Sequence, residues 1–194
     1  MTINREAWLQ TATTALRAHF SAQGYTIPDN VRSTCGWPSK SATARKKRRI
    51  GECWSDDASD GKQFEIFISP ALADQLSVTE TLAHELCHAT VGLKAGHGAA
   101  FKRCATAIGL TGKMTSTEPG PAFLAWFEAQ SFAPYPHETL NASNAAPKQA
   151  TRLIKCECLE CLAEGAPYIV RASQSTLDRG APYCPLHNVP MMQA

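Results

Sequence analysis

The segment Thr81-Leu82-Ala83-His84-Glu85-Leu86-Cys87-His88-Ala89 decides the fold, because it spaces two imidazoles one helical turn apart and puts a carboxylate between them. At about 100° per residue, His84 and His88 lie within roughly 40° of each other on a helix. The opposite side of the helix is apolar, with Leu82, Leu86, Ala89 and Leu93. This H-E-x-x-H spacing predicts a helix that binds metal with one face and packs into a core with the other.

A third histidine follows the expected end of this helix at Val91-Gly92, in the segment Gly96-His97-Gly98. Gly92 can adopt the left-handed conformation that turns the chain after a helix. Catalytic zinc takes three protein ligands and keeps one position for water, so His84, His88 and His97 are the candidate ligands. His97 comes nine residues after His88, a longer spacing than the metzincin pattern has, which excludes that class.

Two other residues of the motif have different expected roles. Glu85 lies too far round the helix to be an easy metal ligand, yet near enough to take a proton from the water. It is the candidate general base. Cys87 lies about 80° from the mean direction of the two histidines, so we expect it to pack in the core.

Length and composition predict a globular protein with one ordinary core and room for a small second module. The chain has 194 residues, of which 44% are hydrophobic and 19% charged. Charged residues such as Arg5 and Arg17 interrupt the apolar pattern of the first twenty positions, so a secretory signal and a membrane span are not expected. We therefore expect a cytoplasmic location and no membrane association.

The remaining periodicities predict a small α+β domain. Apolar residues at helical spacing indicate helices over residues 5–20, 77–91, 98–108 and 118–130, with a helical turn near 70–76 and a glycine-bounded turn over 109–114. Short alternating segments indicate strands over residues 31–37, 50–54 and 64–68. Cys35 and Cys53 fall in these strands and are expected to be buried thiols.

Several of these segments together carry a family resemblance. They are Gly36-Trp37-Pro38, Ile50-Gly51-Glu52-Cys53-Trp54, residues 66–70, His84-Glu85-Leu86-Cys87-His88 and Gly96-His97-Gly98-Ala99-Ala100-Phe101. Over most of residues 1–131 the chain resembles the SprT-like zinc metallopeptidases. The resemblance implies a zincin-like fold, zinc held by His84, His88 and His97, and water activated by Glu85. A eukaryotic member, Spartan, degrades proteins crosslinked to DNA, so the resemblance also implies DNA-linked proteolysis.

A second module is expected at the C-terminal end, over residues 153–194, after a linker rich in Pro, Ala, Asn and Ser over residues 132–152. Two knuckles, Cys158-Leu159-Glu160-Cys161 and Cys184-Pro185-Leu186-His187, have the spacing of a structural zinc ribbon. Cys158, Cys161, Cys184 and His187 are the candidate ligands. Cys156 offers an alternative register to Cys158, although Cys158 matches the two-residue knuckle better.

Charge patterning is compatible with DNA contacts and with ordinary solvated surfaces. Net charge is only +2, but Arg45, Lys46, Lys47, Arg48 and Arg49 form one basic block. This block suits phosphate binding, and it equally suits a solvated loop or a charged strand edge. In the C-terminal module, Tyr168, Val170, Arg171, Arg179 and Tyr183 suit either a nucleic-acid strand or an ordinary hairpin, and charges over 132–194 balance at five basic and five acidic.

These patterns favour a two-zinc metalloendopeptidase, with one catalytic and one structural ion, that acts on protein substrates. Zinc would polarise the scissile carbonyl while Glu85 takes a proton from the attacking water and passes it to the leaving amine. The main alternative is a non-catalytic nucleic-acid-binding or adaptor protein in which both zinc ions are structural. Hydrolysis of a non-peptide substrate is a third reading of the same motif.

Overall fold

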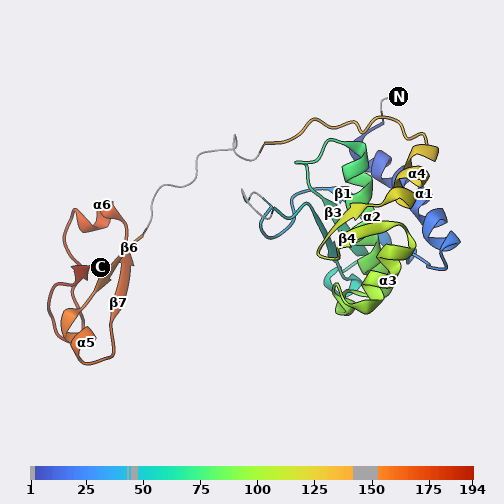
Figure 1. The fold of residues 1–194 in the computed structure, drawn as a ribbon. Helices are drawn as coiled ribbons and strands as arrows, with labels where there is room; N and C mark the ends of the chain where they lie inside the picture. Colours follow the sequence, from blue (N-terminus) through green and yellow to red (C-terminus); the bar gives the residue numbers. More distant parts are fainter. Residues whose placement is uncertain (1–2, 43, 45–47, 142–152) are drawn as a thin grey trace. The chain divides into compact units, whose positions relative to one another are not determined.

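The computed structural model describes residues 3–42, 44, 48–141 and 153–194, and shows a mixed α+β chain in two compact units. The N-terminal unit spans Met1–Ser143 and the C-terminal unit spans Asn144–Ala194 (Figure 1). The N-terminal unit contains α1 (Arg5–Ala22), β1 (Val31–Cys35), β2 (Gly51–Trp54), η1 (Asp56–Ala58), β3 (Phe64–Ile68), α2 (Gln75–Val91), η2 (Leu93–Ala95), α3 (Ala99–Ala107), β4 (Leu110–Lys113), β5 (Ser116–Pro119) and α4 (Pro121–Ala129). The C-terminal unit contains β6 (Ile154–Glu157), α5 (Leu159–Ala163), β7 (Ile169–Ala172), α6 (Gln174–Leu177) and β8 (Met192–Gln193). None of the helices described is long and apolar enough to cross a membrane.

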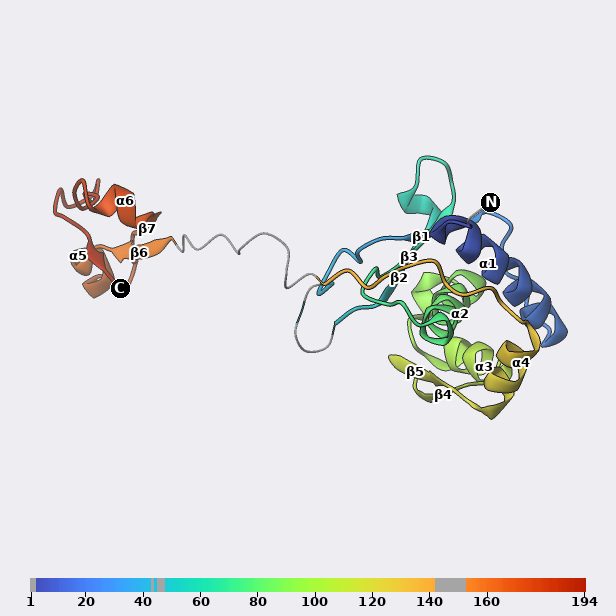
Figure 2. The same cartoon turned by 90° about the horizontal axis from the view of Figure 1, so that it is seen from above.

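A three-stranded sheet organises the N-terminal unit. Its order is β1-β3-β2, with β1 parallel and β2 antiparallel to the central strand β3. Ile66 and Ile68 of β3 are fully buried. The helices cover the sheet: α1 packs against β1, and α2 packs against β2 and β3 (Figure 2). The helix with the H-E-x-x-H motif is therefore held against the edge strand β2.

Local signals at both ends fix the length of α2. The Asp74 carboxylate accepts a hydrogen bond from the Ser77 N–H at 2.8 Å, which satisfies a backbone donor of the first turn. The helix ends at Val91, and Gly92 has φ +83°, a value that favours glycine. The predicted helix end is confirmed. The chain can therefore turn directly from α2 toward His97.

The segment after α3 differs from the prediction. Residues 110–119 form an antiparallel hairpin of β4 and β5, where we predicted a turn followed by a helix from 118. Helix α4 begins only at Pro121, a residue suited to a first helical turn. Gly120 lies so close to Gly109 that an added Cβ would stand 2.6 Å from the Gly109 carbonyl oxygen. The lack of a side chain at Gly120 thus lets the hairpin close at its base.

The segment after α4 also differs from the prediction, because residues 132–141 pack on the N-terminal unit. The Trp8 indole N–H donates to the Ala133 carbonyl at 2.6 Å, and Tyr135 is buried. The His137 ring and the Leu140 N–H both contact the Pro70 carbonyl oxygen, at 2.7 and 2.8 Å. The described half of the expected linker is therefore part of the first unit.

The C-terminal unit is built on a second small sheet, ordered β7-β6-β8. Its buried apolar residues are few, namely Cys156, Cys158, Cys161, Cys184 and Met191, with Val170, Leu177 and Val189 packed beside them. A core of this size is too small to hold a fold of about 40 residues by burial alone. This unit therefore needs another source of stability.

Candidate active site and metal centres

His84 and His88 of α2 meet His97, which follows η2, in a group that we call the histidine cluster. The Nε2 atoms of His84 and His88 each lie 3.2 Å from Nε2 of His97. Four ligands at about 2.0–2.1 Å from a tetrahedral zinc ion lie roughly 3.3–3.4 Å apart. The separations therefore fit three imidazole ligands of one zinc ion.

Phe101 of α3 forms the floor of the histidine cluster. Its fully buried ring lies 4.9, 4.4 and 4.9 Å from the ring centroids of His84, His88 and His97. Packing against one rigid aromatic ring limits the orientations that the imidazoles can take. This contact gives a physical reason for the phenylalanine that follows Gly96-His97-Gly98 in the sequence.

Burial keeps the clustered imidazoles neutral, which is the form that binds metal. Burial, together with the neighbouring imidazoles of His88 and His97, lowers the pKa of His84 to about 3. Burial and His97 lower the pKa of His88 to about 4. Burial also lowers the pKa of the more exposed His97. At neutral pH the cluster therefore offers lone pairs without first losing protons.

Glu85 lies next to the cluster, clamped between α2 and the edge strand β2. The backbone N–H of Cys53 donates to its carboxylate, and the side chain is 7% exposed. A Cβ added to Gly51 would lie 2.6 Å from Glu85 Oε1, so only glycine leaves room for the carboxylate there. Burial raises the pKa of Glu85 to about 8, against the lowering effect of Arg49. A carboxyl group with this pKa can take up and release a proton near neutral pH.

The cysteines of the N-terminal unit do not belong to the histidine cluster. Burial raises the pKa of Cys53 to about 12, and burial also raises the pKa of Cys87, which packs in the core. Neither belongs to a described group that could hold a metal ion. Cys87 packs in the core as expected, whereas Cys35 and Cys53, which we expected to be buried, are only partly buried and pack beside that core.

Two residues that the sequence analysis missed lie behind His84. Oγ1 of Thr117, in β5, lies 2.9 Å from His84 Nδ1. The same hydroxyl donates to Glu80 Oε1 at 2.6 Å. Burial raises the pKa of Glu80, while the Thr117 hydrogen bond lowers it. Glu80 precedes His84 by one helical turn, a spacing visible in the sequence, but Thr117 comes from the hairpin that we did not predict.

A pocket of about 890 Å³ opens over the histidine cluster. Its walls come from β2 and the loop before it, from α2, and from the β4–β5 hairpin. Arg48, Arg49 and Lys113 bring positive charge to its lining, and Arg49 pairs with Glu52. Arg45, Lys46 and Lys47, the rest of the predicted basic block, lie outside the described residues.

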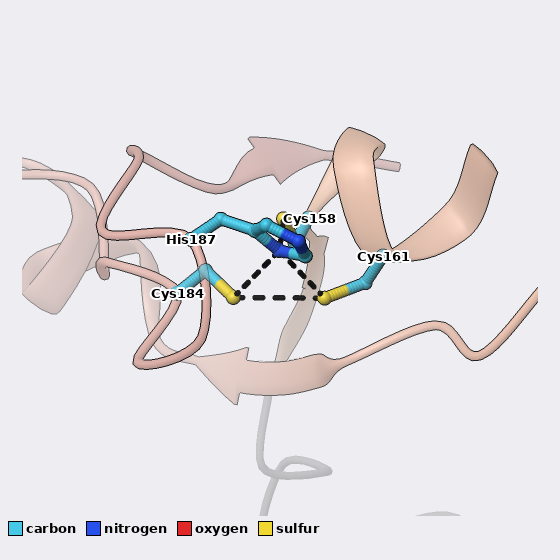
Figure 3. A group of neighbouring side chains, drawn as sticks. All are labelled: Cys158, Cys161, Cys184 and His187. Atoms are coloured by element: carbon cyan, nitrogen blue, oxygen red, sulfur yellow. Dashed lines mark hydrogen bonds between the residues drawn. The ribbon is translucent and has the colours of Figure 1, made fainter. Parts of the chain in front are cut away.

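Cys158, Cys161, Cys184 and His187 form a second group, the cysteine cluster, in the C-terminal unit (Figure 3). Cys161 Sγ lies 3.6 Å from Cys184 Sγ, and His187 Nδ1 lies 3.7, 3.2 and 3.8 Å from the sulfur atoms of Cys158, Cys161 and Cys184. Zinc–sulfur bonds of about 2.3 Å imply sulfur separations of roughly 3.8 Å in a tetrahedron. The group therefore has the size of a four-ligand metal site.

Neighbouring groups suit the cysteine cluster to metal binding. Burial would raise the pKa of Cys184, but hydrogen bonds from the backbone N–H groups of His187 and Leu186, together with those from the His187 and Cys161 side chains, bring it to about 6. The second nitrogen of His187, Nε2, lies 3.2 Å from Glu164 Oε1, as in many metal-binding histidines. Cys156 lies outside the group, so the structure brings together Cys158, not Cys156, with the other three.

Both clusters are therefore candidate metal sites whose donors are consistent with zinc. A sequence model of the SprT-like family matches residues 29–119, a segment that includes β1 to β5, the histidine cluster and Glu85. This match supports the assignment of the segment to the SprT-like family. No curated protein and no solved structure gives a significant match to the chain.

Proposed function

We propose that this protein is a zinc-dependent metalloendopeptidase with its active site at the histidine cluster and a structural zinc ion at the cysteine cluster. The observation that carries the proposal is the placement of a buried carboxylate, Glu85, in the same pocket as three imidazoles spaced for one tetrahedral ion. If the histidine cluster were a purely structural metal site, the buried Glu85 carboxylate beside it would have no role. Such a site would also need a fourth protein ligand, and the described residues bring together only three.

The residues of the chain divide the work of hydrolysis. His84, His88 and His97 would hold zinc, which supplies a Lewis acid and lowers the pKa of a bound water to about 7. Glu85 takes a proton from the attacking water and delivers it to the leaving amine nitrogen. The Cys53 N–H and the space left by Gly51 hold the carboxylate against β2, so it stays aimed at the pocket.

Metal removal tests the proposal. We expect the purified protein to cleave an unfolded protein substrate, to lose this activity in a strong chelator, and to regain it when one equivalent of zinc is returned to the histidine cluster. Activity should follow zinc because the imidazoles by themselves provide no Lewis acid. Cleavage that continues in the fully metal-free protein would contradict the proposal, and so would a fully zinc-loaded protein that cleaves none of a broad substrate panel.

We further propose that the protein substrates are associated with DNA. Support comes from the resemblance to SprT-like peptidases that act on DNA-crosslinked proteins, from the basic block at residues 45–49, and from Arg48 and Arg49 in the pocket lining. Aromatic and basic side chains of the C-terminal unit, including the exposed Tyr168 and Tyr183, offer a second contact surface. The alternative of a non-catalytic adaptor would keep DNA binding and lack cleavage.

Neutralising the basic block is expected to weaken DNA binding. In the triple variant Lys46→Ala, Lys47→Ala and Arg48→Ala, the slope of log affinity against log salt for single-stranded DNA should fall by about 2, because each lost phosphate contact removes roughly 0.7. Arg171→Ala with Arg179→Ala tests the C-terminal unit in the same way. Fluorescence anisotropy at several salt concentrations measures both slopes. Unchanged affinity and slope in both variants would reject the proposed DNA contacts.

A further inference from the structure

Both ring nitrogens of His84 have a contact within hydrogen-bond distance. Its Nε2 faces His97, while its Nδ1 faces Thr117 of β5. For His88 and His97, the hydrogen-bond contacts found in the described part of the chain are only those among the clustered imidazoles. His84 is therefore the cluster member whose second ring nitrogen is engaged by another described residue.

The position of one proton decides which tautomer His84 adopts. Thr117 has a single hydroxyl proton and donates it to Glu80 Oε1 at 2.6 Å. Its oxygen can then only accept at the 2.9 Å contact with His84 Nδ1. Nδ1 must carry a proton to donate there, and a neutral imidazole carries only one. Nε2 is left with a free lone pair on the side of the histidine cluster.

We propose that Glu80 and Thr117 are positioning residues that lock His84 in the Nδ1-protonated tautomer and so prepare Nε2 to bind metal. The inference rests on the proposed function in one respect, namely that the histidine cluster is a metal site. It adds two residues to that site that neither the H-E-x-x-H motif nor the third histidine includes.

The Glu80–Thr117 pair is built into the fold. Glu80 lies one helical turn before His84 on α2, which places the two side chains on one face, and β5 packs against that helix. Glu80 and Thr117 are each only 9% exposed. Among the residues that the structure describes, no lysine or arginine forms an ion pair with Glu80. Burying this carboxyl group without a cation costs free energy. Fixing the orientation of His84 through Thr117 is a role that accounts for its presence.

Other threonines nearby show what an ordinary hydroxyl does. Thr79 and Thr81 of α2 each donate to the backbone carbonyl four residues earlier, at 2.7 Å. Thr111 of β4 donates to the Glu118 carbonyl across the hairpin. Among these, Thr117 differs by linking a carboxyl group to an imidazole. Its place in β5 sets that link, because the strand turns Thr117 inward while its neighbours Ser116 and Glu118 are exposed.

Nitrogen NMR of the metal-free full-length protein tests the tautomer directly. In the wild type we expect the His84 ring to be protonated at Nδ1. In Thr117→Val the acceptor is lost, and in Glu80→Met the hydroxyl is free to donate to Nδ1, so the Nε2-protonated form should grow in both. Thr117→Ser restores the hydroxyl and should restore the wild-type signal. A His84 ring protonated mainly at Nε2 in the wild type would overturn the proposal.

Metal affinity gives a second readout that is independent of cleavage. Cobalt(II) at a thiolate site gives sulfur charge-transfer absorption that an all-imidazole site lacks, so chelator competition can follow the two clusters separately. Thr117→Val should weaken cobalt binding at the histidine cluster by about 10–100-fold, the usual cost of losing an outer-shell partner, and leave the cysteine cluster unchanged. Thr117→Ser should bind almost as the wild type does.

Thr111→Val is the matched control, because it makes the same change on the partner strand of the hairpin, away from His84. It should leave affinity and tautomer unchanged. Wild-type affinity in folded Thr117→Val would refute the positioning role, whether or not the protein proves to be a peptidase. Normal metal binding without cleavage would instead count against the proposed function alone.

Discussion

Glu85→Gln is expected to lower peptide-bond cleavage by about 10²–10⁴-fold, the range typical of losing a general base, while zinc stays bound. The amide has nearly the shape of the carboxylate and can still accept the Cys53 N–H, but it cannot take a proton from water. Zinc should remain because Glu85 is outside the group of three imidazoles. Cleavage of an unfolded protein and zinc per chain should be measured on the same preparation.

Glu128→Gln provides the control for Glu85→Gln. It makes the same chemical change on an exposed carboxylate of α4 and should leave both cleavage and zinc content at wild-type values. If Glu85→Gln retained wild-type cleavage, Glu85 would not be the base. If it lost zinc from the histidine cluster, its role would be structural, and the division of labour proposed above would fail.

Cys161→Ala is expected to remove one zinc ion per chain and to unfold the C-terminal unit while the N-terminal unit stays folded. Binding of a structural zinc ion supplies about 10–16 kcal/mol of apparent folding free energy in small zinc domains. The few buried residues of this unit cannot replace that contribution. Loss of dispersed NMR signals from residues 153–194, together with metal analysis, would measure both effects.

Cys156→Ala is the matched control for this change. Cys156 is as buried as Cys161 and lies five residues away, but it is outside the cysteine cluster. This variant should keep its zinc and its fold, with a modest loss of stability from the smaller side chain. Zinc loss in Cys156→Ala with retention in Cys158→Ala would instead favour the alternative register of the knuckle.

The sequence alone was sufficient for features that depend on local spacing. Residues four apart on a helix share a face, so the approach of His84 to His88 follows from the motif. Gly92 ends α2 as predicted, because a glycine at positive φ is a local signal. The mixed α+β character and the similarity to the SprT-like family could also be predicted, since both rest on patterns that are continuous in the chain.

Features that depend on distant contacts were harder to predict. The β4–β5 hairpin has only Leu110 and Thr117 buried, so it lacks the apolar alternation that reveals a strand. Thr117 therefore could not be placed beside His84, 33 residues away. Likewise, the prolines of residues 132–141 suggested a linker, and only the contacts with Trp8 and Pro70 show that this segment belongs to the first unit.

The hydrogen bond between the Cys53 N–H of β2 and the Glu85 carboxylate has a consequence for the solubility of the protein. The Cys53 N–H points away from β3, and on an unprotected border strand such a donor invites pairing with a foreign chain. The carboxylate occupies that donor, so a residue proposed for proton transfer also shields the sheet from self-association. Glu85→Ala would leave the Cys53 N–H without its acceptor, so loss of activity and aggregation would occur together. Glu85→Gln keeps an acceptor for this N–H and therefore tests the loss of activity alone.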